Sequence, residues 1–304
     1  SRRALTADIV RFCFYPVSVR NIGIVFKIGQ NGNIRTGIIS PGGFTTIMNS
    51  LKEAHQRIGS LQPGQPVTVA LDKALDLVCA EQPRALTNCP TVDSSLKDGF
   101  AVISSDIAGA SPTSPVTLTV TGRLSAGDDS GKAQVTSGTA VRIMTGAPVP
   151  QGATAVLASE FSTCDGERVI VSADARPGRN ILFTASDVLQ GQVLLAKGKK
   201  LTPARLGLLS ASGLHEVSCY PFPRTVVAAT GSELVWPGET IAPGKVAASS
   251  MVTAAAELQR MGISPSTVLL RDDLDILHER FSGLIETFDV LITCGGILDG
   301  DKDL

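Results

Sequence analysis

The stretch Thr225–Leu234, TVVAATGSEL, decides the fold that we expect for this 304-residue chain. Its first half is apolar or β-branched and predicts a buried strand, and Gly231-Ser232-Glu233 then forms a turn that carries a carboxylate. Helices and strands alternate after it, and we expect them over residues 249–261, 267–270, 272–288 and 290–293. This β-α-β-α-β order predicts a parallel sheet with right-handed crossovers, and therefore an α/β domain.

Short polar side chains stand where both helices begin. We expect Ser249 or Ser250 to cap the first helix, because a hydroxyl oxygen can accept a hydrogen bond from an N–H of the first turn. Asp272 or Asp273 is expected to start the second helix in the same way.

Acidic residues follow all three strands, at the edge of the sheet where α/β folds bind ligands. They are Glu233 after the first strand, Asp272 after the second, and Asp301 and Asp303 after the third. Glycines at the same strand ends allow close backbone approach, and they are Gly231, Gly295, Gly296 and Gly300. Carboxylates beside a Gly-rich loop suit a phosphate group bridged by Mg²⁺. Asp272 and Asp273 have an equally weighted alternative reading as helix caps.

The chain before residue 200 has a different pattern. Short alternating strands separated by Gly, Ser and Asp turns predict an all-β insert, with strands over 100–103, 116–123, 133–135, 139–144, 153–158, 169–172 and 193–195. Two strands over 22–28 and 34–39 read as a hairpin. Helices are expected over 45–58, opened by Thr45 or Thr46, over 71–80, and from Pro203 to the stop at Gly213.

These shifts in pattern divide the chain. We expect an unassigned N-terminal segment (1–43), an elongated linker domain (44–90 and 151–200), a β-rich inserted domain (91–150) and the α/β domain (201–304). The chain starts at Ser1 without a methionine and stops at Leu304 directly after a strand and a loop, so we expect the α/β domain to be truncated.

One loop in the β insert combines rigidity with polar groups. In Arg142–Pro150, RIMTGAPVP, the glycine opens backbone angles closed to other residues and the two prolines fix φ. Thr145 and the Gly146 turn could bind an anion, with Arg142 as a further partner. The competing readings are an ordinary connection between strands and, for Arg142, a salt bridge within the sheet.

Composition excludes several classes of protein. A net charge of −1 without basic clusters argues against nucleic-acid binding, and no apolar run is long enough for a membrane span. Six scattered cysteines without a CxxC pair indicate neither a zinc site nor a disulfide framework, and favour a cytoplasmic protein with reduced thiols. No GxGxxG follows a strand, and Gly238–Lys245 departs from a P-loop in its spacing and in the residue after its lysine.

Several motifs together resemble the molybdopterin molybdenumtransferase family, known as MoeA in bacteria and as the E domain of gephyrin in animals. The resemblance covers residues 44–304 and lies in Asp93–Ala101, Arg142–Pro150 with Gly152-Ala153, Asn180 with Asp187-Val188, Leu201–Ala204, Ala229–Leu234, Leu270–Asp273, and Gly295-Gly296 with Gly300.

This resemblance implies a fold and a reaction. The fold is α/β plus β: an elongated multidomain chain with an all-β insert and a three-layer, parallel-sheet domain of the molybdopterin-binding type, incomplete at its C-terminus. Members of the family insert molybdate into adenylylated molybdopterin with Mg²⁺ or a similar divalent ion, and release AMP. They are homodimers, with an active site between the α/β domain of one subunit and the β insert of the other. Molybdopterin adenylyltransferase and molybdoenzymes are the implied protein partners.

The family's site residues can be placed on this sequence only through the resemblance. The catalytic positions fall on Asp98, Thr145, Asp187, Glu233, Asp272 and Asp303. Contacts to the pterin substrate are expected from Arg142, Gly146, Gly231, Gly295, Gly296 and Gly300, and metal ligands from Glu233, Asp272, Asp301 and Asp303.

The sequence also departs from the family pattern. Positions where the family has other residues are Lys97, Phe100, Ala185, Ser186, Ser232, Ala248 and Leu298. Ser232 replaces an acid, and Leu298 replaces a hydroxyl that could face phosphate. Two alternatives to the enzyme therefore stay open: a catalytically weak relative that acts as a molybdopterin-binding or protein-scaffolding module, and a generic α/β phosphate-binding module.

Overall fold

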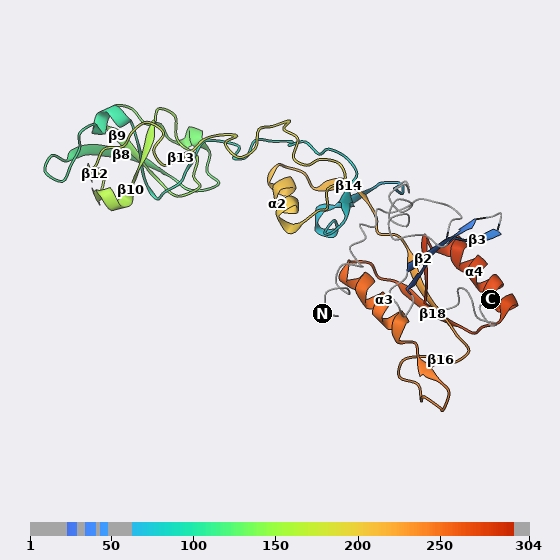
Figure 1. Cartoon of the computed structure of the whole chain (residues 1–304). Helices are drawn as coiled ribbons and strands as arrows, with labels where there is room; N and C mark the ends of the chain where they lie inside the picture. Colours follow the sequence, from blue (N-terminus) through green and yellow to red (C-terminus); the bar gives the residue numbers. More distant parts are fainter. Residues whose placement is uncertain (1–22, 29–33, 41–42, 48–62, 295–304) are drawn as a thin grey trace. The chain divides into compact units, whose positions relative to one another are not determined.

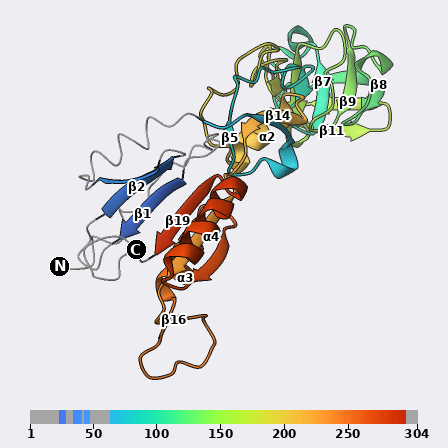
Figure 2. The same ribbon diagram turned by 90° about the vertical axis from the view of Figure 1, so that its right-hand side faces the viewer.

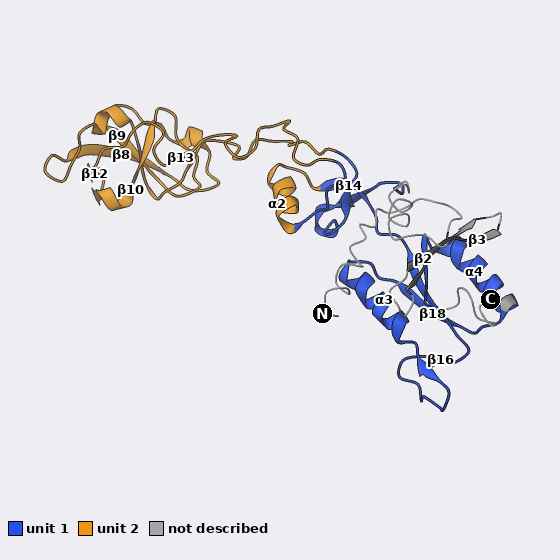
Figure 3. Ribbon diagram, viewed as in Figure 1, with its two compact units in different colours: residues 1–81, 197–202, 216–304 blue, residues 82–196, 203–215 orange. Residues whose placement is uncertain are grey.

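The computed structural model describes residues 23–28, 34–40, 43–47 and 63–294. Its contacts divide the chain into two units (Figure 3). Unit 1 comprises residues 1–81, 197–202 and 216–304, and unit 2 comprises residues 82–196 and 203–215. The chain therefore leaves unit 1 and returns to it twice. In the described part, sheets dominate and helices are few.

A parallel sheet forms the centre of unit 1. Strand β15 (Thr225–Thr230) lies in the middle, with β18 (Ser266–Leu270) on one side and β19 (Val290–Cys294) on the other. Both pairings are parallel, which confirms the expectation from the alternating pattern. The strand that opens the sequence motif is thus the central strand of the sheet.

Helices cover both faces of this sheet (Figures 1 and 2). Helix α3 (Ser249–Arg260) packs on the face that carries Val227 and Ala229. Helix α4 (Leu274–Thr287) packs on the other face, against Val226 and Ala228. Side chains alternate along a strand with a period of two, so one apolar run supplies a core on each face.

Three smaller sheets complete unit 1. Strands β1 (Gly23–Ile28) and β2 (Ile34–Ser40) form the expected hairpin, to which β3 (Gly43–Ile47) adds, and β1 lies beside β19. A second sheet has the order β4-β14-β5, and a two-stranded sheet joins β16 to β17. Their bounds are Val67–Ala70 for β4, Val78–Cys79 for β5, Glu216–Tyr220 for β14, Leu234–Val235 for β16 and Val246–Ala247 for β17.

Unit 2 is built on a six-stranded sheet with the order β10-β7-β9-β8-β12-β11. The strands are β7 (Gly99–Val102), β8 (Val116–Leu124), β9 (Thr139–Ile143), β10 (Ala155–Ala158), β11 (Ser162–Asp165) and β12 (Arg168–Val171). A two-stranded sheet pairs β6 (Ser94–Ser95) with β13 (Ile181–Leu182), and α2 spans Pro203–Ala211. The large sheet holds strands from both sides of residue 150, so it crosses the domain boundary that we expected there.

Some expected elements are wrong. Residues 71–80 do not form one helix: a single 3₁₀ turn (Leu71–Lys73) is followed by Asp76 with φ of 65° and then by β5. A left-handed residue interrupts a helix, and Val78 and Cys79 gain strand partners in β14 instead. Tertiary pairing has overridden the local helical pattern.

Three further expectations differ from the structure. Thr45 and Thr46 lie within β3 and do not open a helix. Residues 48–58 lie outside the described part. Ser249 and Ser250 are the first residues of α3, whose cap residue is Ala248 and makes no side-chain cap bond. The segments 133–135 and 193–195 form isolated bridges only.

Within the described ranges, no helix has the length and apolar character that a membrane span requires.

Candidate functional site

Asp98 and Thr145 meet in unit 2. Thr145 donates two hydrogen bonds to the Asp98 Oδ1 atom, from its backbone N at 2.7 Å and from its hydroxyl at 2.8 Å. The turn is further fixed because the N–H of Gly146, a residue with φ of 79°, donates to the Ser95 carbonyl at 2.8 Å. Both side chains are exposed, so the pair lies at the surface of the sheet.

These bonds lower the pKa of Asp98. The backbone N–H of Thr145, and then its hydroxyl, hold the pKa of the Asp98 carboxyl below its usual value. Both bonds therefore stabilise the ionised form of Asp98. Because Thr145 spends both donors on this carboxylate, the pair presents negative charge, which suits a cation or a hydrogen-bond donor better than the oxyanion that we expected at Thr145.

A second pair of the same kind was missed in the sequence. Thr184 donates to the Asp93 Oδ1 atom from its backbone N at 2.8 Å and from its hydroxyl at 2.7 Å. This bond holds the turn that carries Asp187, whose own N–H donates to the Cys89 carbonyl at 3.0 Å. Asp93 lies in one of the motifs that we matched, yet only the fold shows that it pairs with a threonine far along the chain.

The segment 93–98 thus anchors two turns at once. Asp98 holds the Thr145 turn and Asp93 holds the Thr184 turn, while β6 between them pairs with β13. Three of the six catalytic candidates, Asp98, Thr145 and Asp187, consequently belong to one hydrogen-bonded framework. All three side chains are exposed.

Arg142 lies on β9, opposite Phe100 of β7, and its side chain is exposed. In the described part of the chain, no ion pair involves it. The salt-bridge alternative for Arg142 therefore finds no support among these residues.

Ser232 and Asp272 join two strand ends in unit 1. The Ser232 N–H donates to the Asp272 Oδ2 atom at 2.9 Å, and the Asp272 N–H donates to the Ser232 hydroxyl oxygen at 3.2 Å. Lys245 adds a third bond, from its ammonium to the Ser232 carbonyl at 2.7 Å. Ser232, a position where the sequence departs from the family, is thus hydrogen-bonded to both Asp272 and Lys245. Sequence reasoning named neither Ser232 nor Lys245 as a site residue.

Glu233 folds back over Gly231. Both Glu233 carboxylate oxygens lie 2.7 Å from the place where a Cβ on residue 231 would stand, so a side chain there would displace the carboxylate. The β16–β17 pairing fixes the Glu233 backbone, whose carbonyl accepts a bond from Val246 N–H at 3.0 Å. Glycine at 231 therefore leaves room for the close approach of the carboxylate.

The two neighbouring aspartates have different roles. Asp273 caps α4, accepting from the Ile276 N–H at 3.1 Å, which confirms the cap reading for this residue. Asp272 makes no such cap and keeps its carboxylate at the strand end, hydrogen-bonded to Ser232. The helix-cap reading therefore holds for Asp273 and does not describe Asp272.

The remaining candidates, Asp301, Asp303, Gly295, Gly296 and Gly300, lie outside the described residues. Within the described ranges, no group of three or more His, Cys, Asp or Glu side chains could hold a metal ion.

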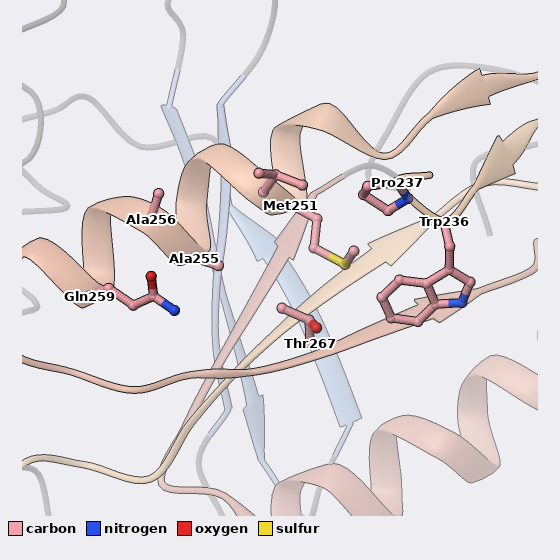
Figure 4. Close-up of a pocket in the computed structure, with 8 residues that line it drawn as sticks. Trp236, Pro237, Met251, Ala255, Ala256, Gln259 and Thr267 are labelled. Carbon is pink, nitrogen blue, oxygen red and sulfur yellow. The ribbon is translucent and has the colours of Figure 1, made fainter. Parts of the chain in front are cut away.

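A cavity of about 340 Å³ lies elsewhere in unit 1, against α3 and β18 (Figure 4). Met251 of α3, Thr267 of β18 and Trp236, which directly follows β16, turn toward it. Its lining is largely apolar, with Gln259 and Thr267 as polar residues and no charged side chain. None of the candidate residues lines this cavity, and its lining has no positively charged side chain that could bind phosphate or molybdate. We therefore do not place the site there.

Comparisons with known proteins identify relatives of this chain. Residues 49–213 match the family model of the MoeA N-terminal region (domain I and II). The chain is 36% identical over 260 residues to molybdopterin molybdenumtransferase 2 of Mycobacterium tuberculosis and 34% identical over 255 residues to molybdopterin molybdenumtransferase of Staphylococcus aureus. Both alignments cover 83% of this chain, and 63% and 61% of those relatives. The chain thus spans less than two thirds of the length of these relatives.

Solved structures agree. A structure of the molybdopterin biosynthesis MoeA protein of Pyrococcus horikoshii superimposes with a TM-score of 0.67 at 29% identity, covering 82% of this chain and 64% of that one. A second structure of that protein gives the same TM-score at 30% identity, covering 76% of this chain and 61% of that one.

Proposed function

This chain belongs to the MoeA family, and from that premise we propose that it acts in molybdenum cofactor biosynthesis, inserting molybdate into adenylylated molybdopterin with release of AMP. The observation that carries the proposal is the pair of carboxylates, Glu233 and Asp272, at adjoining strand ends of the parallel sheet. This is the edge at which α/β sheets bind ligands.

The donor set suits a hard divalent cation. Mg²⁺ in proteins is held by one or two carboxylates, and its other positions go to water and to substrate phosphates. Glu233 and Asp272 supply two carboxylates at neighbouring strand ends, the number that such a site uses. A bound Mg²⁺ would neutralise phosphate charge and act as a Lewis acid toward the bond that releases AMP.

Hydrogen bonds within the chain orient the carboxylates that we assign to the site. Ser232 N–H fixes the direction of the Asp272 carboxylate, and Lys245 fixes the Ser232 carbonyl behind it. Asp98, whose ionised form accepts two hydrogen bonds from Thr145, offers a carboxylate that can accept a hydrogen bond from a polar substrate group. Asp187 offers a second exposed carboxylate in the same unit.

Asp272→Asn tests the proposal directly, with Asp273→Asn as the matched control. Purified protein is incubated with adenylylated molybdopterin, molybdate and Mg²⁺, and AMP release is followed. We expect D272N to lose at least tenfold in rate, in line with the loss of a positioned charged group, and D273N to lose helix stability with much less effect on the rate. Unchanged AMP release in D272N would refute the assignment.

One observation favours a second candidate, a molybdopterin-binding scaffold of weak activity. Ser232 stands where the family has an acid, and its N–H and hydroxyl are both engaged with Asp272. The strand end therefore carries one carboxylate fewer for a cation. Tight binding of adenylylated molybdopterin without AMP release, together with release in S232D, would establish this alternative.

The setting of the reaction follows the same premise. We propose a cytoplasmic homodimer that receives its substrate from molybdopterin adenylyltransferase and passes its product to molybdoenzymes. Sedimentation of the purified chain with and without substrate tests the dimer, and a monomer under both conditions would exclude it.

A further inference from the structure

Two cysteines stand directly opposite each other in the small sheet of unit 1. Cys79 of β5 is the register partner of Cys219 of β14, in an antiparallel pair. Both are free thiols, and both are fully buried at 0% exposure. The two lie far apart in the sequence, so only the fold brings them together.

Backbone hydrogen bonds show which kind of pair this is. The Cys79 N–H donates to the Lys199 carbonyl at 2.9 Å and the Cys79 carbonyl accepts from the Gly198 N–H at 2.8 Å. Both groups of Cys79 therefore point away from β14, while its neighbour Ala80 donates across to the Ser218 carbonyl at 2.8 Å. Cys79 and Cys219 form a non-hydrogen-bonded pair, the closer of the two kinds in an antiparallel ladder.

That geometry meets the requirement for a disulfide. The Cα atoms of a non-hydrogen-bonded pair lie about 4.5 Å apart, inside the range of roughly 4.4–6.8 Å that disulfides span. The Cβ atoms lie on the same face of the sheet, because they are direct register partners. A small local shift would bring the two sulfur atoms into bonding distance.

The surroundings keep both groups protonated at neutral pH. Burial raises the pKa of the Cys79 thiol, and burial together with the neighbouring Cys79 raises the pKa of Cys219 to about 12. The thiolate is the attacking form, so reaction in the closed sheet is slow and depends on brief opening of the strands. Strand β5 has only two residues, which makes such opening local.

We propose that Cys79 and Cys219 are an intramolecular disulfide site, closed by reaction with a small-molecule disulfide of the glutathione type. One cysteine thiolate attacks that disulfide, forms a mixed disulfide and releases one thiol. The second cysteine then attacks the protein sulfur of the mixed disulfide and releases the second thiol. Two protein thiols are oxidised, and one small disulfide is reduced to two thiols.

The position of the site gives the bond a consequence. Cys79 precedes the whole of unit 2 in the chain and Cys219 follows it. A bond between them closes a ring that contains all of unit 2 and ties β5 to β14, so that β5 can no longer separate from the sheet. The proposal does not depend on the reaction that we propose for the chain.

Oxidation of the unmodified chain tests the site, with exposed Cys164 as an internal control. The folded protein is incubated with oxidised glutathione and then denatured, the remaining thiols are alkylated, and the peptides are mapped by mass spectrometry without reduction. We expect Cys164 to gain glutathione first, and a Cys79–Cys219 linked peptide to follow with the loss of two thiols. Dithiothreitol should restore both thiols.

Two other outcomes would overturn the site. One is modified Cys164 with Cys79 and Cys219 still alkylated after long incubation. The other is glutathione retained on Cys79 or Cys219 without ring closure.

Cys79→Ser and Cys219→Ser are the matched variants, and each should trap a mixed disulfide on the remaining cysteine. Cys164→Ser, at an exposed position, should still form the linked peptide. Hydrogen exchange gives a readout that needs no variant. The Ala80 amide, bonded across the pair, should exchange more slowly in the oxidised protein. Equal exchange in both forms would show that the bond does not restrain the sheet.

Discussion

Strand β7 of unit 2 and strand β15 of unit 1 are both buried along their whole length, yet their packing differs. In unit 2, Gly99 of β7 lies so close to β10 that a Cβ would collide with the Leu157 carbonyl. In unit 1, β15 has side chains at every position, and helices cover both of its faces. Close backbone approach at Gly99 is therefore part of the packing of β7, whereas β15 is packed by side chains on both faces.

The two units also differ in the hydrogen bonding of their threonine hydroxyls. The buried hydroxyls of Thr230 and Thr293 have no hydrogen-bond partner in the described part of the chain. Both residues lie near the carboxyl ends of their strands, where the candidate carboxylates of unit 1 begin. In unit 2, the exposed candidates Asp98 and Thr145 are hydrogen-bonded to each other. Unit 1 thus carries a cost in stability at its candidate edge that the Asp98–Thr145 turn does not.

The largest effect should come from Gly99→Ala, which forces a Cβ against the Leu157 carbonyl. We expect a loss of about 3 kcal/mol in the free energy of unfolding of unit 2, the upper end for overpacking, because backbone must move. Gly122→Ala is the control, since its Cβ would meet only Ala133 at 3.5 Å. Denaturation followed by hydrogen exchange assigns the loss to a unit. Equal effects of both variants would contradict close backbone approach as the cause.

Two threonines of unit 1 should respond to the same substitution with opposite signs. Thr293→Val removes an unpartnered buried hydroxyl and should raise the free energy of unfolding by about 1 kcal/mol. Thr225→Val removes a hydroxyl that donates to the Pro223 carbonyl at 3.0 Å, and should lower it by about 1 kcal/mol. Urea denaturation measures both. A loss in T293V would mean that its hydroxyl has a partner in the folded protein.

A smaller effect is expected at the opposite edge of the parallel sheet. The Arg224 guanidinium donates to both oxygens of Asp289, at 3.1 Å and 2.8 Å, and holds the pKa of that carboxyl below its usual value. The stabilisation exists above the ordinary carboxyl pKa and is lost as the pH falls through the lowered pKa. Asp289→Asn should therefore lower the melting temperature slightly at neutral pH and match the parent protein in acid. A difference that persists at low pH would point to another cause.

The smallest expected effect is a change in the pKa of Asp98. Thr145→Val keeps the backbone donor to Asp98 and removes the hydroxyl donor. We expect the Asp98 pKa to rise toward its usual value without reaching it, because the backbone bond is the larger cause of the lowering. Carboxyl chemical shifts in a pH titration measure this. Thr184→Val, at the equivalent bond to Asp93, is the control and should leave Asp98 unchanged.

Sequence reasoning succeeded where one pattern had one physical meaning. The apolar run 225–229 with helical periods after it predicted β15, α3, β18, α4 and β19, all of which are present, because burial on two faces demands such a pattern. It failed over 71–80, where an apolar stripe at helical spacing became a 3₁₀ turn and a strand. Partners in β14, far along the chain, outweighed the local propensity there.

The candidate site divides in the same way. Residue identity alone placed Glu233 and Asp272 after parallel strands, and the parallel pairing brings those strand ends to one edge. Identity could not show that Ser232 holds Asp272, that Thr145 gives both donors to Asp98, or that Asp93 and Thr184 form a second such pair. These bonds join residues distant in sequence, so no local pattern encodes them.

The sequence by itself determined the family, the parallel sheet and the residues that can carry charge, since composition, period and motif order are properties of the chain. Tertiary structure alone decided which donors those charges meet, and which two of the cysteines face each other across a sheet. The physical reason is that hydrogen bonds and thiol pairing act over a few ångströms in space. Partners that are far apart in the sequence come within that distance only when the strands take their register.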